Sequence, residues 1–110
     1  MKVSFQGFGE GIATFEASGE IKPGVPVRLS KNGTVAACSN GEVPCGISVQ
    51  ARGGLVSVQL KGYARVKCGA SVVIGWQYIM GDAGGKIKKS DTGLPALVVD
   101  VQDGNCGLIL

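Results

Sequence analysis

A chain of 110 residues has the size of one ordinary domain, and its 45% apolar fraction is enough to fill one hydrophobic core. A charged fraction of 17% excludes a disordered tail, and a net charge of +3, scattered except at Lys86, Lys88 and Lys89, argues against a nucleic-acid partner. The chain opens without a signal-like segment and holds no run of ~18 apolar residues, so we expect a soluble protein made in the cytoplasm, with no membrane partner.

Glycine is the most informative residue of this composition. Nineteen glycines are present, and the longest stretch without one, Leu94–Asp103, carries Pro95 at its second position. Glycine and proline interrupt helices, whereas typical globular helices run to about 11 residues. The sequence therefore leaves little room for a core helix and predicts short strands joined by turns.

The predicted strands follow one another between turn residues. Residues 12–17 (IATFEA) alternate as a half-buried strand does. Asn32-Gly33 predicts a β-hairpin over residues 25–38, since both residues tolerate positive φ. A turn at residues 51–54 joins CGISVQ to LVSVQL, whose Ser57 and Gln59 should share a wet face. Further strands are expected at 63–66, 71–74, 77–80, 86–88, 97–101 and 106–110.

The two halves of the chain resemble each other. IKPGVPVRL, from Ile21, matches VKCGASVVI, from Val66, at an offset of 45 residues, although chance similarity between hairpins would also explain the match. We predict an all-β fold: a compact small β-barrel or sandwich built from two weakly similar halves. A flexible N-terminal arm is expected over residues 1–11, and a single β domain over residues 12–110.

The glycine-rich opening QGFGEG, residues 6–11, is not a phosphate-binding loop. Its spacing differs from the dinucleotide fingerprint, and no Lys-Ser or Lys-Thr follows the last glycine, as a P-loop needs. The segment instead carries three apolar residues, Val3, Phe5 and Phe8. They either fold back on their own domain or add to a partner's sheet.

The sequence offers no catalytic constellation. Histidine, the commonest acid-base catalyst, is absent from the chain. Cys68 beside Lys67 is the best candidate nucleophile, but no general base accompanies it. Cys38, Cys45 and Cys106 complete an irregular set that predicts small buried hydrophobes rather than disulfides or a zinc site. We expect no enzyme, no catalytic residue, no cofactor and no metal.

Trp76 is the only tryptophan, and Tyr78 follows it two residues later. Such a pair is typical of a partly buried core position, and its functional alternative is an interface anchor.

The order of these pieces resembles the small β-rich decoration, or cement, proteins of tailed-phage heads. The shared pattern is a G-x-x-V unit, a G-I-S-V strand, a V-x-V-x-L-x-G strand and a second G-x-x-V unit. It is carried by IKPGVPVRL, GEVPCGISVQARGGLVSVQLKGYARV, KCGASVVIGWQYIMGDAGGKIKK and LPALVVDVQDGNCGLIL, and it covers residues 11–110. The chain departs from that pattern at QARGG, where the family usually has alanine-rich turns, and in its cysteines.

This resemblance implies a non-enzymatic protein on the outer surface of the virion. Such proteins bind the major capsid protein of an expanded head, commonly as homotrimers, and clamp neighbouring coat subunits. Val3, Phe5 and Phe8 would then form the capsid-binding arm, and Trp76 and Tyr78 a subunit interface, while sheet edges pair with neighbours.

Other functions stay open at this point. A small β-barrel module that binds a ligand or nucleic acid would need exposed aromatics beside basic residues, and the aromatics here do not interleave with lysines. A lipoyl-type carrier would use Lys31, before the Asn32-Gly33 turn. An enzyme would depend on Cys68 alone.

Overall fold

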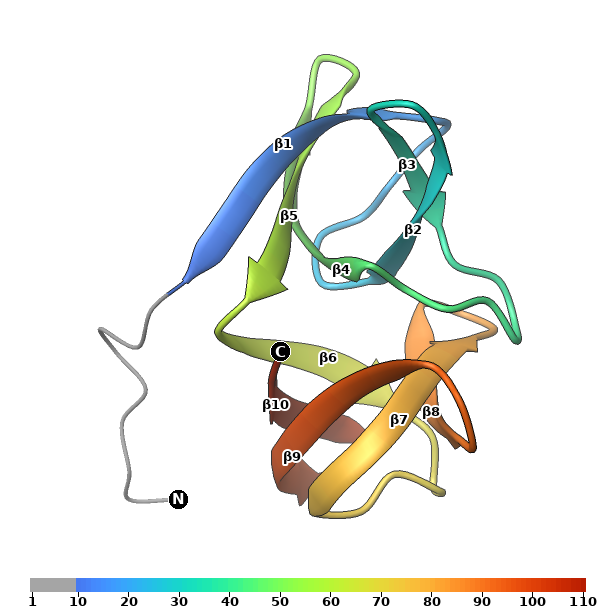
Figure 1. Cartoon of the computed structure of the whole chain (residues 1–110), viewed down its shortest axis with the longest axis vertical. Coiled ribbons are helices and arrows are strands. Elements are labelled where there is room, and N and C mark those ends of the chain that lie inside the picture. Colours follow the sequence, from blue (N-terminus) through green and yellow to red (C-terminus); the bar gives the residue numbers. More distant parts are fainter. Residues whose placement is uncertain (1–9) are drawn as a thin grey trace.

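Two β-barrels make up the part of the chain that the structure describes. The computed structural model describes residues 10–110, which form ten strands and no helix. The strands close into two barrels of five strands each, one above the other in Figure 1. The prediction of an all-β fold built from two similar halves is therefore confirmed. Most of the predicted arm lies outside the described residues, and Gly11 is already the first residue of a strand.

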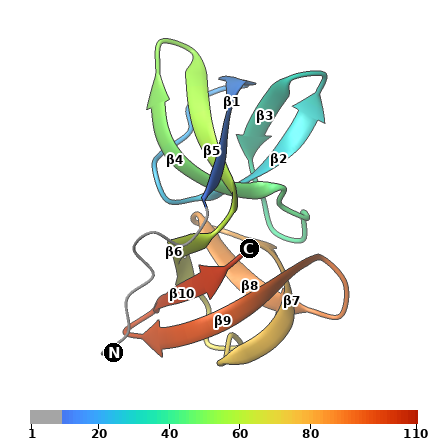
Figure 2. The same ribbon diagram turned by 60° about the vertical axis from the view of Figure 1, so that its left-hand side comes forward.

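The first barrel contains the first five strands, in the order β1-β3-β2-β4-β5. Their bounds are β1 Gly11–Ala17, β2 Pro26–Lys31, β3 Thr34–Ala37, β4 Gly46–Arg52 and β5 Leu55–Lys61. β4 pairs with β5 along most of its length, but with β2 only at Ile47 and Gly46. The β2–β3 and β4–β5 hairpins consequently diverge at the upper end of this barrel (Figure 2).

The second barrel has the order β10-β6-β8-β7-β9. Its strands are β6 Tyr63–Cys68, β7 Gly75–Asp82, β8 Lys86–Ser90, β9 Leu94–Gln102 and β10 Asn105–Ile109. Here β7 and β9 pair over five residues, so this barrel is more completely closed than the first. Closure satisfies the backbone groups of most strands and leaves few edges on which another chain can add a strand.

The two barrels share one topology. β1 runs parallel to β3, with Glu16 beside Thr34, and β6 runs parallel to β8, with Lys67 beside Lys86. These two pairs determine which residues of the two halves are equivalent. The equivalence differs from the 45-residue offset that the sequence suggested. Val66 corresponds to Phe15 within the strand and not to Ile21, which follows β1.

Each barrel has its own hydrophobic core. The core of the first is small, with Ile21, Val27, Val35, Val56 and Val58. The second is larger and includes Ala64, Val66, Cys68, Val72, Ile79, Ile87, Ala96, Val98, Cys106 and Leu108. Ile47 of the first barrel, 2% exposed, belongs to this second cluster. A side chain from β4 therefore ties the two barrels together.

The predicted turns are mostly confirmed. β2 and β3 form the expected hairpin at Asn32-Gly33, although only Gly33 has a positive φ. The second hairpin turns at Gly53-Gly54 alone, because residues 51 and 52 still belong to β4. Both glycines have positive φ, 58° and 80°, as a two-residue turn between twisted strands requires.

Two expectations about strands were wrong. Residues 71–74 form a loop in which Val72 alone is buried, so this apolar run is no strand. Gln59 is 7% exposed instead of wet, because the second barrel covers the outer face of β5 at this point. Its amide Nε2 donates hydrogen bonds to the carbonyl oxygens of Lys61 and Tyr63, 3.1 and 2.8 Å away, so its burial is compensated.

The barrels meet closely. Gly62, with φ 101°, is the only residue between β5 and β6. The backbone N–H of Gly41 donates to the carbonyl of Gly81 (3.0 Å), and the N–H of Gly81 donates to the carbonyl of Glu42 (2.7 Å). Lys88 Nζ donates to Asn40 Oδ1 at 2.5 Å. The loop between β3 and β4 is therefore hydrogen-bonded to β7 and β8.

Candidate interaction surface

Apolar side chains gather on the outer face of the second barrel. Trp76 and Tyr78 on β7 are 74% and 50% exposed, and Ile74, just before the strand, is 69% exposed. Trp76 lies opposite Leu97 on β9, and Tyr78 lies opposite Pro95. Because cross-strand partners share a face, these side chains point outward together. We call Ile74, Trp76, Tyr78, Pro95 and Leu97 the Trp76 surface.

β7 is turned with its more apolar face toward solvent. The outward set includes Trp76 and Tyr78, whereas Gln77 and Ile79 face the core. Gln77 Oε1 is buried and has no hydrogen-bond partner within residues 10–110. A strand normally buries its more apolar face, so β7, with its tryptophan outward and a glutamine inward, departs from the usual pattern.

Glycines shape the ends of this surface. Gly75 begins β7 with φ 112°, and Gly93, with φ 149°, precedes β9. A side chain at Gly93 would collide with the carbonyl oxygen of Ile79, so only glycine lets β9 start this close to β7. The connection from β8 to β9 is short as a result, and it leaves Tyr78 and Pro95 uncovered.

The structure places Trp76 and Tyr78 on the same outer face of the second barrel, and their role as a subunit interface stays a prediction. The alternative, partial core, does not describe side chains that are half or more exposed. Leu97 and Pro95 were not singled out from the sequence, because their pairing with β7 is a long-range contact that periodicity does not reveal. The predicted arm residues Val3, Phe5 and Phe8 lie outside the described residues.

The cysteines behave as buried hydrophobic residues. Cys38, Cys68 and Cys106 are 8%, 5% and 0% exposed, Cys45 is partly buried, and all four are free thiols. Burial, with smaller effects of Cys68 and Asp100, raises the pKa of Cys106 to about 12. Burial also raises the pKa of Cys38 to about 11, assisted by Glu42. Such thiols are protonated and poorly accessible at neutral pH.

Among residues 10–110, two ion pairs join partly exposed side chains. Arg65 reaches Asp100 on the outside of the second barrel at 2.8 Å, and its guanidinium also donates to the Tyr63 hydroxyl at 3.0 Å. Arg28 Nε lies 2.6 Å from Glu42 in the loop that contacts β7. Within residues 10–110, no three histidine, cysteine or acidic side chains gather as metal ligands would.

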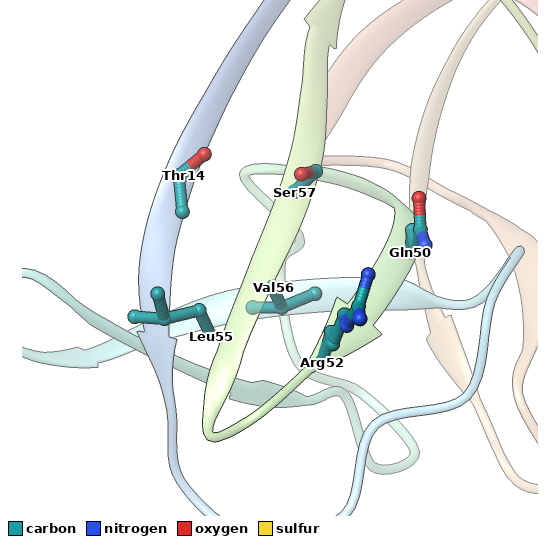
Figure 3. Close-up of a pocket in the computed structure, with 6 residues that line it drawn as sticks. All are labelled: Thr14, Gln50, Arg52, Leu55, Val56 and Ser57. Carbon is teal, nitrogen blue, oxygen red and sulfur yellow. The ribbon is translucent and has the colours of Figure 1, made fainter.

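A shallow hollow of about 330 Å³ lies on the outer face of the first barrel (Figure 3). Its walls come from β1, β4 and β5, with Thr14, Ser57 and Gln50 in a row across the three strands. Arg52 is the one charged residue among those that line it; the others are Leu55 and Val56. The hollow mixes polar and apolar side chains and contains no acid or base pair.

No described helix has the length and apolar character of a membrane span. Comparison of the sequence with known protein families and with curated proteins found no match.

Proposed function

We propose that this chain is a capsid decoration protein. It binds the major capsid protein on the outer surface of an expanded phage head and stabilises the head by clamping neighbouring coat subunits, without enzymatic activity. The observation that carries the proposal is the Trp76 surface, an apolar patch held on paired strands of a closed barrel. Exposed aromatic side chains on a rigid support are typical anchors of protein contacts. The pattern of motifs over residues 11–110 supports the same assignment.

The proposed mechanism divides binding between two parts of the chain. Val3, Phe5 and Phe8 contact the coat protein, while Trp76 and Tyr78 join the subunits of a homotrimer. The arm leads directly into β1, which pairs with β5 from Gly11 to Glu16. A pull on the arm is thus transmitted along a paired strand into the barrel. Three weak arm contacts in one oligomer act together, because each later contact is intramolecular.

Binding to heads tests this function directly. Expanded heads assembled from the coat protein of the same genome are sedimented with the full chain and with a chain that lacks residues 2–9. We expect the full chain to co-sediment at saturable stoichiometry and the shortened chain to bind at least tenfold more weakly. Equal binding by both forms would remove the arm from the mechanism, and no binding by either would remove the proposed function.

A second candidate is a small β-barrel module for single-stranded nucleic acid or a ligand. The arrangement of strands favours it in one respect, since β8 brings Lys88 opposite Met80, next to the exposed Tyr78 on β7. Aromatic faces beside lysines bind unstacked bases. Titration of the Trp76 fluorescence with an oligothymidylate at low salt tests this function, and an unchanged signal would exclude it for that probe.

A further inference from the structure

We propose that the Trp76 surface receives the first barrel of a second copy of this chain. The contact repeats, between two chains, the contact that joins the two barrels within one chain. The proposal rests on the proposed function in one respect, the expectation that the chain works as a homo-oligomer. It adds the partner surface and the geometry of the contact.

The contact within the chain has two distinct sides. On the first barrel, Pro26, Ile47 and Gln59 are all buried. Ile47 pairs with Pro26 on one side and with Gln59 on the other, so the three side chains share the outer face that the second barrel covers. On the second barrel, the receiving side includes Gly81 and Lys88, which contact the β3–β4 loop.

Strand registers show which residues of the second barrel correspond to the covered face. The parallel pairs make Thr34 equivalent to Lys86, so Ala37 and Lys89, three residues later on each strand, are equivalent as well. Val27 lies opposite Ala37 and Ile79 lies opposite Lys89, so Val27 corresponds to Ile79. Pro26, one residue earlier on β2, therefore corresponds to Tyr78.

The β4–β5 hairpin of the first barrel and the β9–β10 hairpin of the second extend this correspondence. Ile47 lies opposite Gln59, and Leu97 lies opposite Ile109, one step beyond the pairs Ser48–Val58 and Val98–Leu108. Leu97 therefore corresponds to Ile47. Ile47 pairs with Pro26, whereas Leu97 pairs with Trp76 and not with Tyr78, so the register of β7 against β9 is shifted by two residues relative to that of β2 against β4.

The corresponding faces differ in exposure. Ile47 is 2% exposed and Pro26 is fully buried. By contrast, Tyr78 is 50% exposed, and Trp76, two residues before it on the same face of β7, is 74% exposed. The face that the first barrel buries against its neighbour is thus present on the second barrel, apolar and uncovered. A repeat unit whose neighbour-facing side is apolar is completed by one more unit, and here that unit is the first barrel of another chain.

The receiving side has a counterpart on the first barrel as well. Gly81 lies opposite Ile87 on β8, and Leu29 lies opposite Val35 on β3, so Leu29 takes the position of Gly81. Gly81 is buried at the junction, while Leu29 is 56% exposed. The exposed Asn32-Gly33 turn corresponds to the β7–β8 turn that meets the first barrel at Gly85.

The two contacts are matched in volume. Within the chain, the long loop between β3 and β4 fills the junction, and only glycine fits at position 81, because a Cβ there would overlap Cys38. Between chains, the short connection from β8 to β9 leaves that space empty, and the leucine at position 29 has the volume to fill it. The larger side chain on one side therefore compensates for the shorter loop on the other.

Such a contact is heterologous, because two different surfaces of the same chain meet. Copies joined in this way form a closed ring when the rotation between them closes, and a filament when it does not. A ring of three copies is the geometry that agrees with the proposed homotrimer.

The mass of the full chain in solution tests the inference without any capsid. Sedimentation equilibrium over a concentration series is measured for the wild type, Trp76→Glu and Leu29→Glu. Leu55→Glu is the matched control, since Leu55 is 49% exposed on the first barrel but lies outside the proposed contact. Circular dichroism checks that each variant keeps its strands, and Leu29→Gln replaces Leu29→Glu if the latter does not fold.

We expect the wild type and Leu55→Glu to form oligomers, and Trp76→Glu and Leu29→Glu to sediment as single chains of 11.2 kDa. An equimolar mixture of the two monomeric variants should form dimers and nothing larger, because it contains one intact copy of each surface. An oligomeric Leu29→Glu, or a wild type that stays monomeric at every concentration, would overturn the inference. Capsid binding is measured in a separate experiment. A loss of capsid binding with intact oligomers would contradict only the proposed function, and monomers that still bind capsids would contradict only this contact.

Discussion

Leu29 and Gly81 occupy the same position in the two barrels, yet one faces solvent and the other lies in the junction. Leu29 is 56% exposed on β2, whereas a Cβ at Gly81 would overlap Cys38 Cβ and approach the carbonyl oxygen of Ser39 within 2.9 Å. The backbones meet there through the hydrogen bonds of Gly81 with Gly41 and Glu42. One repeated position thus serves a close backbone contact in one half and a side-chain contact in the other.

The substitution Gly81→Ala tests the close contact. We expect a loss of about 1–3 kcal/mol in the free energy of unfolding, because the added methyl group must push the β3–β4 loop away from β7. Urea unfolding measures the change. Gly69→Ala is the matched control, since the nearest atom to its Cβ lies at 3.7 Å and no backbone strain arises. Equal stability of the two variants would show that the loop moves aside freely.

The substitution Ile47→Ala tests how strongly the first barrel is tied to the second. Ile47 is 2% exposed and packs in the core cluster of the second barrel. Its truncation should lower the unfolding free energy by about 2–5 kcal/mol, as for other large buried aliphatic residues. Val49→Ala is the control: Val49 lies two residues further along β4 and is 42% exposed, so its truncation should cost less than about 1 kcal/mol. A small effect of Ile47→Ala would mean that the barrels are held together by the loop alone.

Local sequence signals predicted the strands well, because alternation and glycine turns are local properties. Residues 55–60 alternate, Gly53-Gly54 allows a tight turn, and both features appear in the β4–β5 hairpin. The parallel pairing of β1 with β3 was not predicted, since it joins strands through a closed barrel and leaves no local pattern. The prediction of a strand at residues 71–74 was wrong, because a short apolar run has the same sequence pattern in a strand and in a loop that buries one side chain.

The candidate surface was predicted only in part. Trp76 and Tyr78 stand out as aromatic residues two positions apart, but the sequence does not determine which face of a strand is buried. By hydrophobicity alone, these two would point inward and Gln77 outward. The core instead takes Ile79, and the choice is settled by long-range packing against β8 and β9. The burial of Gln59 had the same kind of cause, a second barrel whose position no local signal encodes.

The carboxyl group of Glu42 should titrate below its ordinary range. The Ser39 backbone N–H, 2.6 Å from Oε1, is the main cause of its lowered pKa, and Arg28 assists. Carboxyl NMR shifts followed against pH measure this midpoint. Arg28→Gln should move the pKa only part of the way back, because the hydrogen bond to Ser39 remains. A full return to the ordinary value would show that the ion pair alone holds the carboxylate.

The Cys106 thiol should make the free energy of unfolding depend on pH in the alkaline range. Its pKa is raised by burial from 9.0 to about 12 in the folded chain, so the folded state keeps the thiol proton to higher pH than the unfolded state does. The resulting stabilisation is fully present below pH 9.0 and is lost as the pH rises toward 12. Over this window, the unfolding free energy should fall by up to ~1.4 kcal/mol per pH unit for one thiol.

Comparison with Cys106→Ala isolates this effect from the titration of lysines and tyrosines, which both chains share. Removing the thiol costs stability at neutral pH through the lost packing of a fully buried side chain. The difference in unfolding free energy between wild type and variant should then shrink as the pH rises from 9 to 12, because only the wild type loses the contribution of a protonated thiol. A difference that stays constant across this range would mean that Cys106 ionises as readily in the folded chain as in the unfolded one.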